Sequence, residues 1–197
     1  MTNFTDVAVG DLFTGKNGRA VFVRDYLDKH PGEFPVYSAS LESPFGYIDS
    51  HDYDADDHGG KMLTWVMNGY GGRVQEVAGK FSANRDRGVL VPNDGVQAPD
   101  LTYLRYEIEP VFVAAAVGRR VEGRRNDYTK LYPADAMAQR ILVPVDGRGR
   151  YDHAKMMDLG ARLRRIEAAQ AAVRTALGEV LSARVTIESL ASGSGSA

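Results

Sequence analysis

The sequence predicts an α+β fold in which a mixed β-sheet module is followed by one long C-terminal helix. Two observations carry this prediction. Up to about Pro144, short runs rich in β-branched and aromatic residues alternate with Gly, Pro, Asn and Asp. From Asp152 onward, a proline-free stretch rich in Ala, Leu, Arg and Glu replaces that pattern. We therefore expect the module at residues 1–151, the helix at residues 152–190, and a flexible Ser- and Gly-rich tail at residues 191–197.

Strand-like runs occur throughout the module, separated by turn residues. They cover residues 19–24, 35–38, 62–67, 73–78, 88–92, 101–108 and 139–144. A helix is expected over residues 110–120, because a proline in the first turn precedes an alanine-rich segment. A second, short helix is expected at residues 133–139. The pattern leaves the strand order of the sheet open.

The glycine cluster at residues 68–72 raises the question of a nucleotide site. A dinucleotide fingerprint needs a third glycine where Val74 stands, and no Lys-Ser or Lys-Thr pair follows as in a P-loop. The flanking runs have the composition of two strands instead. The Asn-Gly dipeptide favours a type I′ turn, so the cluster is predicted to present Tyr70 and Arg73 at a hairpin tip.

The C-terminal stretch carries a heptad pattern over about four heptads. Its inward positions form a seam made of Leu159, Leu163, Ile166, Gln170, Val173, Leu177, Val180, Arg184 and Ile187. Asp152 is expected to cap the helix, residues 155–188 would form a rod of roughly 50 Å, and Gly160 and Gly178 would each weaken it by about 1 kcal/mol. The rod either folds back over the module or pairs in an antiparallel coiled coil with another copy or another protein. Polar residues within the seam favour the coiled coil, because a polar inward residue fixes register.

Composition restricts the function classes. The formal net charge is −2, and cysteine is absent, which excludes disulfides and cysteine-based metal sites. No apolar run approaches the roughly 20 residues that span a bilayer, and the N-terminus lacks a signal-peptide pattern, so a cytoplasmic location is expected. The negative net charge argues weakly against a nonspecific nucleic-acid binder, but the charges are unevenly distributed along the sequence. Basic residues gather at residues 80–87, 118–130 and 160–167.

Motifs for catalysis are missing from the sequence. There is no Gly-x-Ser-x-Gly elbow, no cysteine nucleophile and no His-Glu-x-x-His motif. The acidic segment 51–58 holds metal-ligand residue types, but as a calcium loop it has Asp57 and Leu63 where glycine and glutamate are needed. We interpret it as a solvated loop, and we predict a non-catalytic chain with no metal site and no cofactor of its own.

The basic segments have the chemistry of DNA contacts. Arg and Lys stand there beside Ser, Asn, Thr and Tyr, on loops next to glycine. Arginine matches guanine or phosphate in bidentate geometry, Asn and Gln match adenine, and hydroxyl groups match phosphate. One charged loop is usually only solvated, whereas several in one small module indicate contact with DNA.

Several stretches, in this order, resemble a known family. They are VGDLFTG (9–15), FPVYSASLESPFGYID (34–49), LTWVMNGYGGRVQ (63–75), KFSANRDRGVLVP (80–92), TYLRY (102–106) and NDYTKLYPADAMAQRILVPVDGRGRYD (126–152). Together they resemble the target recognition domain of type I restriction-modification specificity subunits, followed by the spacer helix. The last stretch, directly ahead of a long heptad helix, is the most specific element of the resemblance.

The resemblance implies a function. In that family, a mixed α/β domain reads one half of a split DNA target, largely through the major groove, and the long helix packs antiparallel with its equivalent to space the half-sites. The subunit is non-catalytic, in agreement with the motif search. It docks a methyltransferase subunit, which uses S-adenosylmethionine to modify adenine, and through the assembly a restriction and translocase subunit.

The chain departs from the usual family pattern in having one recognition domain and one helix instead of two of each. It is therefore expected to form a homodimer through the helix, which would restore the two-domain form and predict a palindromic, interrupted target. The start of the helix also lacks the Gln-rich segment common in the family, and Ser38 stands where glycine is common.

Candidate contacts with double-stranded DNA follow from chemistry and loop position, not from the resemblance. They are Tyr70, Arg73, Lys80, Ser82, Asn84, Arg85, Arg87, Arg119, Arg120, Arg124, Arg125, Asn126 and Lys130. Tyr128 and Leu131 are expected to pack inside the module.

Two alternative functions stay open. The first is a coiled-coil interaction or scaffold protein that does not bind DNA, which a weak salt dependence of binding would indicate. The second is a carbohydrate or small-ligand module that uses Trp65 and the tyrosines. Against the second, Trp65 stands within a strand-like run, where tryptophan is more often a core residue.

Overall fold

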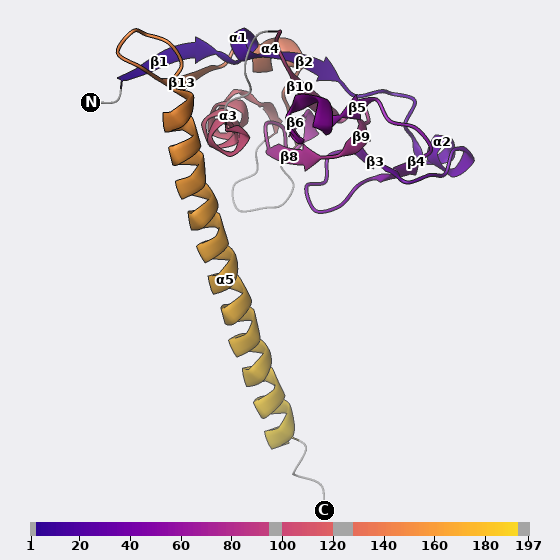
Figure 1. The fold of residues 1–197 in the computed structure, drawn as a ribbon. Helices are drawn as coiled ribbons and strands as arrows, with labels where there is room; N and C mark the ends of the chain where they lie inside the picture. The colour runs from indigo at the N-terminus through magenta and orange to yellow at the C-terminus, as the bar shows by residue number, and fades with distance from the viewer. Residues whose placement is uncertain (1–2, 95–99, 120–127, 193–197) are drawn as a thin grey trace, which may run out of the picture.

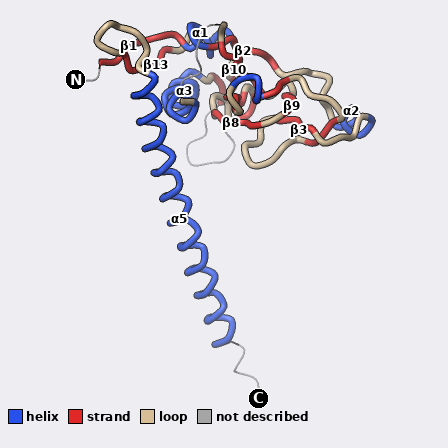
Figure 2. The backbone as a smooth tube through the Cα atoms, viewed as in Figure 1, coloured by secondary structure: helices blue, strands red, loops and turns tan. Residues whose placement is uncertain are grey.

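A module of short strands and helices is joined to one long projecting helix in the computed structural model (Figure 1). The structure describes residues 3–94, 100–119 and 128–192, with side chains up to residue 182. Within those residues the strands form four small sheets, all of them in the module. Figure 2 shows that α5 (His153–Ser192) continues alone beyond the strands. The α+β class with a long C-terminal helix is thereby confirmed.

The central sheet has the strand order β2–β10–β6–β8 and is antiparallel throughout. Its strands are β2 (Phe13–Asn17), β6 (Lys61–Val66), β8 (Val74–Ala78) and β10 (Arg87–Pro92). The strands predicted at residues 62–67, 73–78 and 88–92 are confirmed. Trp65 on β6 is fully buried, and its Nε1 donates to the Leu131 carbonyl at 3.0 Å. It offers no platform to a sugar ring, and the prediction that Leu131 packs inside is also confirmed.

A second sheet has the order β4–β3–β9–β5, with β3 and β9 parallel. Its strands are β3 (Phe34–Tyr37), β4 (Gly46–Ile48), β5 (Tyr53–Asp54) and β9 (Lys80–Ala83), and α2 (Arg24–Lys29) and the short 3₁₀ helix η1 (Ala55–His58) lie beside it. The strand predicted at residues 35–38 is confirmed, but the one at 19–24 is wrong. That segment forms a turn leading into α2, because Phe22 is buried in a separate cluster with Leu27, Val36 and Ile48.

The segment predicted as a strand at residues 101–108 is the first half of a helix, α3 (Leu101–Ala115). Asp100 caps it, since its Oδ1 accepts a hydrogen bond from the Tyr103 backbone N–H at 3.0 Å. The buried apolar residues of this helix recur at helical spacing: Tyr103, Leu104, Ile108 and Phe112. The helix predicted at 110–120 therefore exists, but it begins earlier, carries Pro110 in its interior and ends before Ala116.

The remaining elements close the module and build its edge. Strand β1 (Asn3–Ala8) pairs antiparallel with β13 (Arg140–Val145), beside α1 (Val9–Leu12) and α4 (Pro133–Met137). The short strands β7 (Asn68–Gly69), β11 (Val117–Arg119) and β12 (Tyr128–Lys130) form a third sheet in the order β11–β12–β7. The strand and helix predicted at residues 139–144 and 133–139 are confirmed.

Helix α5 uses its first turns to dock on the module. Asp152 caps it as predicted, since its Oδ1 accepts from the Lys155 backbone N–H at 2.9 Å. Met156 is fully buried in the main core, and Leu159 and Leu163 pack partly buried against the same core. Leu159 and Leu163 thus cover part of the chain's own module, and their place in a partner seam stays a prediction.

Ion pairs at the junction fix the direction in which α5 leaves. Glu167 accepts hydrogen bonds from the Arg105 guanidinium and from the Tyr106 hydroxyl, both on α3. Arg164 lies 2.7 Å from Asp100 Oδ2 and donates to the Thr102 hydroxyl at 3.1 Å. Residues 168–182 are all exposed, so the helix does not fold back over the module. With 40 residues, α5 is about 60 Å long.

Replacing Gly160 or Gly178 with alanine is expected to change the stability of the protein in opposite directions. A Cβ on Gly160 would overlap the Asp100 carboxylate, which caps α3 and binds Arg164. Gly160→Ala should therefore lower the free energy of unfolding by about 1–3 kcal/mol, as overpacking usually does. A Cβ on Gly178 meets nothing within 4 Å, so Gly178→Ala should raise stability by up to about 1 kcal/mol. Thermal unfolding followed by circular dichroism measures both; equal shifts in the same direction would contradict the Asp100 contact.

Glu76 on β8 is expected to make the fold acid-sensitive. Although burial alone would raise it, the pKa of Glu76 is held below 4.5 by hydrogen bonds from Lys61 and Thr102 and by the charges of Lys61 and Arg105. A lowered folded-state pKa gives stability that is present above the unfolded value and is lost as the pH falls through the folded one. Glu76→Gln should thus lower the melting temperature at pH 7, and the difference from wild type should shrink below about pH 4.5. The exposed Glu179→Gln, on the projecting helix, is the control; a difference that does not change with pH would contradict the prediction.

Candidate nucleic-acid interface

The three-stranded sheet brings separate basic segments of the sequence together. Its middle strand β12 pairs with β11 on one side and with β7 on the other. The Asn68 amide on β7 donates to the Arg85 carbonyl at 3.3 Å and to Asp86 Oδ1 at 3.0 Å. Three separate parts of the chain thus meet around this sheet. They are the glycine cluster, the turn at Arg85 and the two strands that flank residues 120–127.

The glycine cluster joins β6 to β8 as predicted, but its turn is not type I′. That turn requires a positive φ at Asn68, and among the described residues only glycines have positive φ. Gly69 and Gly72 have φ values of 107° and 91°, and a Cβ on Gly72 would lie 2.5 Å from the α3 backbone. The Gly71 N–H donates to Thr129 Oγ1 at 3.0 Å. The glycines therefore serve close backbone packing, and no phosphate cradle is formed.

Four of the predicted DNA contacts lie exposed around this sheet. They are Tyr70, Arg73, Arg85 and Arg119. Tyr70 is 49% exposed, and the Arg73 side chain is 51% exposed with its Nε 3.3 Å from Glu109 Oε1. Lys130 is half-buried, with its ammonium 5.7 Å from the centre of the Tyr128 ring. Tyr128 is itself 53% exposed, so the prediction that it packs inside is wrong.

Three predicted contacts lie inside the fold, and these predictions are wrong for that reason. Ser82 is fully buried, and its Oγ accepts from the Asp52 backbone N–H at 3.0 Å. Asn84 is buried and accepts from the Asp86 backbone N–H at 3.0 Å. Arg87 is fully buried on β10. All three side chains are buried, so none of them offers a contact surface to DNA.

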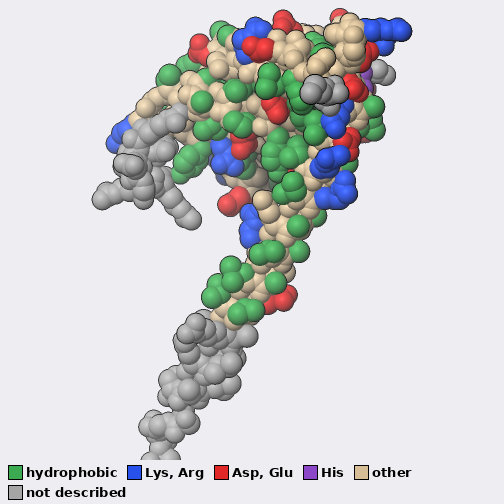
Figure 3. Space-filling model, turned by 90° about the vertical axis from the view of Figure 1, so that its left-hand side faces the viewer, with side chains coloured by type: hydrophobic (Ala, Val, Ile, Leu, Met, Phe, Trp, Pro, Cys, Tyr) green, Lys and Arg blue, Asp and Glu red, His purple; other side chains and the backbone are tan. Residues whose placement is uncertain are grey.

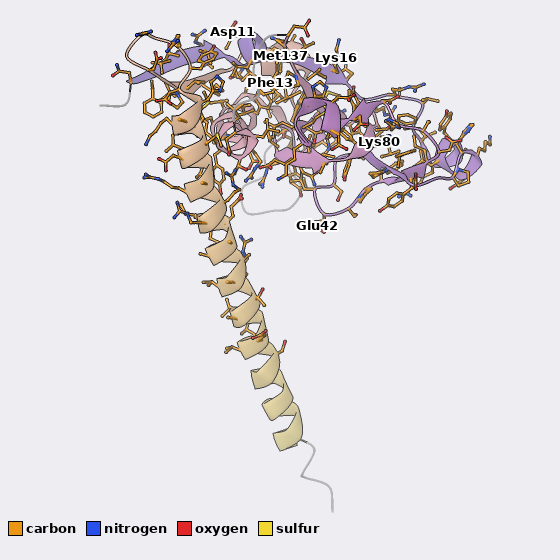
Figure 4. The ribbon with its side chains drawn as sticks, in the orientation of Figure 1. Asp11, Phe13, Lys16, Glu42, Lys80 and Met137 are labelled. Carbon is orange, nitrogen blue, oxygen red and sulfur yellow. The ribbon has the colours of Figure 1, made fainter. Side chains whose placement is uncertain are left out.

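Lys80 lies apart from the other candidates. It stands at the start of β9, 3.7 Å from Asp54 on the neighbouring strand β5. Figure 4 places it away from the loop that carries Glu42. Arg120, Arg124, Arg125 and Asn126 lie outside the described residues.

A hollow of about 610 Å³ opens beside the exposed candidates. One wall is formed by Val66, Gly69, Tyr70 and Arg73. The loop between β3 and β4 also lines the hollow, through residues 39–42. That loop was not predicted as part of the site, because its short run of Ser, Ala, Leu and Glu carries no charge cluster. In Figure 4, Glu42 stands at the tip of this loop, on the side towards which α5 extends.

Arg87 lies behind this loop. Its Nη2 donates to the Ser40 carbonyl at 2.6 Å, and its guanidinium lies 6.0 Å from the centre of the Tyr37 ring. Nε and Nη1 have no hydrogen-bond partner among the described residues. Burial lowers the pKa of Arg87 to about 10, so the group still carries its charge at neutral pH.

The projecting part of α5 presents an apolar seam to solvent. Ile166, Val173, Leu177 and Val180 are each at least half exposed, and Gln170 is exposed between them. Figure 3 shows hydrophobic side chains following this part of the helix. The side chains of Arg184 and Ile187 lie outside the described residues.

The acidic segment has partners within the chain. Asp52 lies 3.1 Å from Arg19, and Asp54 accepts from the Asp56 backbone N–H at 3.0 Å. Over the described residues, no group of three or more His, Cys, Asp or Glu side chains is arranged to hold a metal ion. Nor does any helix in that part of the chain have the length and apolar content that a membrane span requires.

No family model matches the sequence. Individual proteins do match it. Over 113 residues, the chain is 37% identical to the specificity subunit of the type I restriction enzyme MpnII from Mycoplasma pneumoniae, covering 56% of this chain and 32% of that protein. A second M. pneumoniae protein, provisionally named a type I specificity subunit, is 37% identical over 113 residues, or 56% of this chain and 43% of its own length. A third, provisionally named the N-terminus of such a subunit, is 28% identical over 144 residues, covering 70% of this chain and 74% of its own length.

Solved structures share the fold at low sequence identity. The S subunit of the type I restriction-modification system from M. genitalium has a TM-score of 0.62 at 17% identity, over 86% of this chain and 41% of that one. The HsdS subunit from Thermoanaerobacter tengcongensis has a TM-score of 0.56 at 13% identity, over 88% of this chain and 39% of that one. The chain thus spans about two fifths of the length of these proteins. In sequence and in fold, this chain is similar to type I restriction-modification specificity subunits.

Proposed function

We propose that this chain is the non-catalytic DNA-recognition component of a restriction-modification system. The observation that carries the proposal is the convergence of exposed Tyr70, Arg73, Arg85 and Arg119 around one small sheet, beside a hollow of about 610 Å³. Arginines and a tyrosine around a concave surface provide phosphate contacts and donors for base edges in one place. The relatives named as type I specificity subunits support the same function.

The module would bind one half of a split double-stranded target. It would direct a methyltransferase subunit, which carries S-adenosylmethionine, and through the assembly a restriction and translocase subunit. The chain itself contributes recognition and docking and no catalytic group.

We further propose that two copies pair through the seam of α5. The support is the row of apolar side chains from Ile166 to Val180, which the module leaves exposed. An antiparallel pair of such helices would relate the two modules by a twofold axis. The DNA target of this dimer would be palindromic and interrupted by a spacer.

The test is DNA binding by the chain in complex with its methyltransferase, measured over a range of salt concentrations. A specific binder that neutralises several phosphates loses affinity steeply, with a slope of about −0.9 per phosphate in log K against log salt. Binding to partner proteins that is insensitive to salt, with no affinity for any duplex, would instead indicate a scaffold protein and overturn the proposal.

Sequencing of the methylated sites in cells that carry the complex tests the dimer separately. An interrupted palindrome is the expected target. An asymmetric target would contradict the homodimer while leaving DNA recognition intact, because the second half-site would then be read by a different module.

A further inference from the structure

The loop between β3 and β4 is fixed from behind by two side chains of the central sheet. Arg87 on β10 donates to the Ser40 carbonyl at 2.6 Å. Gln75 on β8 donates through Nε2 to the next carbonyl, that of Leu41, at 3.3 Å. Within the loop, Ser40 Oγ accepts from the Glu42 backbone N–H at 3.2 Å. Two successive carbonyls and one turn are thus held in place, and Glu42 follows directly from them.

Burying the Arg87 side chain is energetically unfavourable for a position that only supports the fold. Removing a guanidinium from water is unfavourable unless its donors and its charge are compensated. Here Nη2 has the Ser40 carbonyl, the Tyr37 ring lies 6.0 Å away, and the described residues supply no partner for Nε or Nη1. The one strong bond of this buried side chain is directed at the wall of the hollow.

The hollow is lined both by a side chain that only accepts hydrogen bonds and by one that only donates them. Glu42 supplies carboxylate oxygens, which only accept. Arg73 lines the same hollow beside Tyr70, and its Nε lies 3.3 Å from Glu109 Oε1. In the major groove a G·C pair presents the amino group of cytosine N4 next to the O6 and N7 acceptors of guanine. A carboxylate and an arginine that line the same hollow match that pair.

We propose that Arg87 is a positioning residue for base recognition, which holds residues 40–42 so that Glu42 and Arg73 read one G·C base pair. Glu42 accepts from cytosine N4, and Arg73 donates to guanine O6 and N7. Arg87 touches no DNA and acts through the loop. This inference rests on the proposed function and adds to it a base pair and the residues that select it.

The experiment starts from the complex of the full chain with its methyltransferase. A randomised duplex library selected by the wild-type complex gives the target, and the same selection is repeated with Glu42→Gln and with Arg87→Met. Both variants should relax the preference at the same G·C pair and leave the other positions unchanged. Specific affinity should fall about tenfold in each, while affinity for a nonspecific duplex stays within about twofold.

A double variant tests whether Arg87 acts through Glu42. If it does, Glu42→Gln with Arg87→Met should bind no more weakly than the weaker single variant, because both remove the same contact. Arg87→Lys keeps a charged donor near Ser40 and should restore part of the preference. Arg85→Ala is the control, and it should weaken specific and nonspecific binding alike without changing the preferred sequence.

Several outcomes would overturn the inference. One is an Arg87→Met protein that melts at lower temperature and loses specific and nonspecific affinity in equal measure, since that indicates a merely structural role. Another is relaxation by Arg87→Met at a different base pair from Glu42→Gln, or no relaxation at all. If neither variant relaxes the preference at a shared G·C pair while the wild-type complex still binds a defined target, the inference is wrong and the proposed function remains. Absence of DNA binding by the wild-type complex would overturn both.

Discussion

Replacing Val173 and Leu177 with aspartate is expected to convert the proposed dimer into a monomer. Both side chains are more than half exposed in the single chain and lie on the seam of α5. Burying a side chain of this size contributes about 1.5–3 kcal/mol, and a twofold dimer buries each residue twice. The double variant also places four carboxylates in the contact, so the dissociation constant should rise at least about a thousandfold. Light scattering after size exclusion should then give a mass near 21.5 kDa in place of twice that value.

The matched control places the same charges on the opposite face of the helix. Ala168 and Thr175 are exposed and lie about half a turn away from the seam. Ala168→Asp with Thr175→Asp should leave the dimer intact and should change helix content to a similar extent. Equal dissociation by both double variants would mean that charge on the helix in general, and not the seam, governs assembly. A wild-type chain that is monomeric at every concentration would contradict the homodimer directly.

The elements predicted correctly from the sequence are those whose pattern is local. The runs at residues 62–67, 73–78, 88–92 and 139–144 are strands because apolar and β-branched residues follow one another between turn residues. Helix α5 follows from its heptads and from the Asp152 cap. In each case the local preference agrees with the burial that the fold imposes.

Two elements were predicted wrongly, one because a local signal was outweighed and one because distant contacts decide it. Residues 101–108 combine Thr, Tyr and Ile, which favour strands, yet Asp100 caps them as a helix whose buried face covers the central sheet. In the segment at residues 19–24, one buried residue, Phe22, anchors a small cluster, and the neighbouring Val21 and Val23 stay exposed. Tertiary packing decides the segment at residues 19–24. For α3 the Asp100 cap and the helical spacing of its buried residues were visible in the sequence, but the strand preference of Thr, Tyr and Ile was given more weight.

The candidate site was predictable in its chemistry and not in its geometry. Charge and loop position identified Tyr70, Arg73, Arg85 and Arg119, all of which lie exposed. The same criteria also selected Arg87, because burial of an arginine depends on strands far apart in the sequence. Residues 39–42 were missed for the opposite reason: their importance comes only from the hollow that they share with Arg73.

Alanine at Tyr70 and Arg73 is expected to weaken binding to the specific target about a hundredfold, with much less effect on other duplexes. Both side chains line the hollow, where an arginine and an aromatic ring are available to base edges. Alanine at Arg85 and Arg119 should act differently. These exposed arginines lie outside the hollow, and as phosphate contacts they should weaken all duplexes alike. Their loss should reduce the salt slope by about 2, since each phosphate contributes about 0.9.

Fluorescence anisotropy with a specific and a scrambled duplex, each at several salt concentrations, separates the two classes. Arg140→Ala is the control because it removes the same charge from β13, where Arg140 pairs with Asp6, and it should change neither affinity nor slope. Unchanged specific affinity after Tyr70→Ala and Arg73→Ala would mean that the glycine cluster is not part of the DNA interface. If alanine at Arg85 and Arg119 leaves the salt slope unchanged, the phosphate contacts lie elsewhere on the module. Either result would leave the similarity to type I specificity subunits intact, because that similarity rests on sequence and fold and not on these side chains.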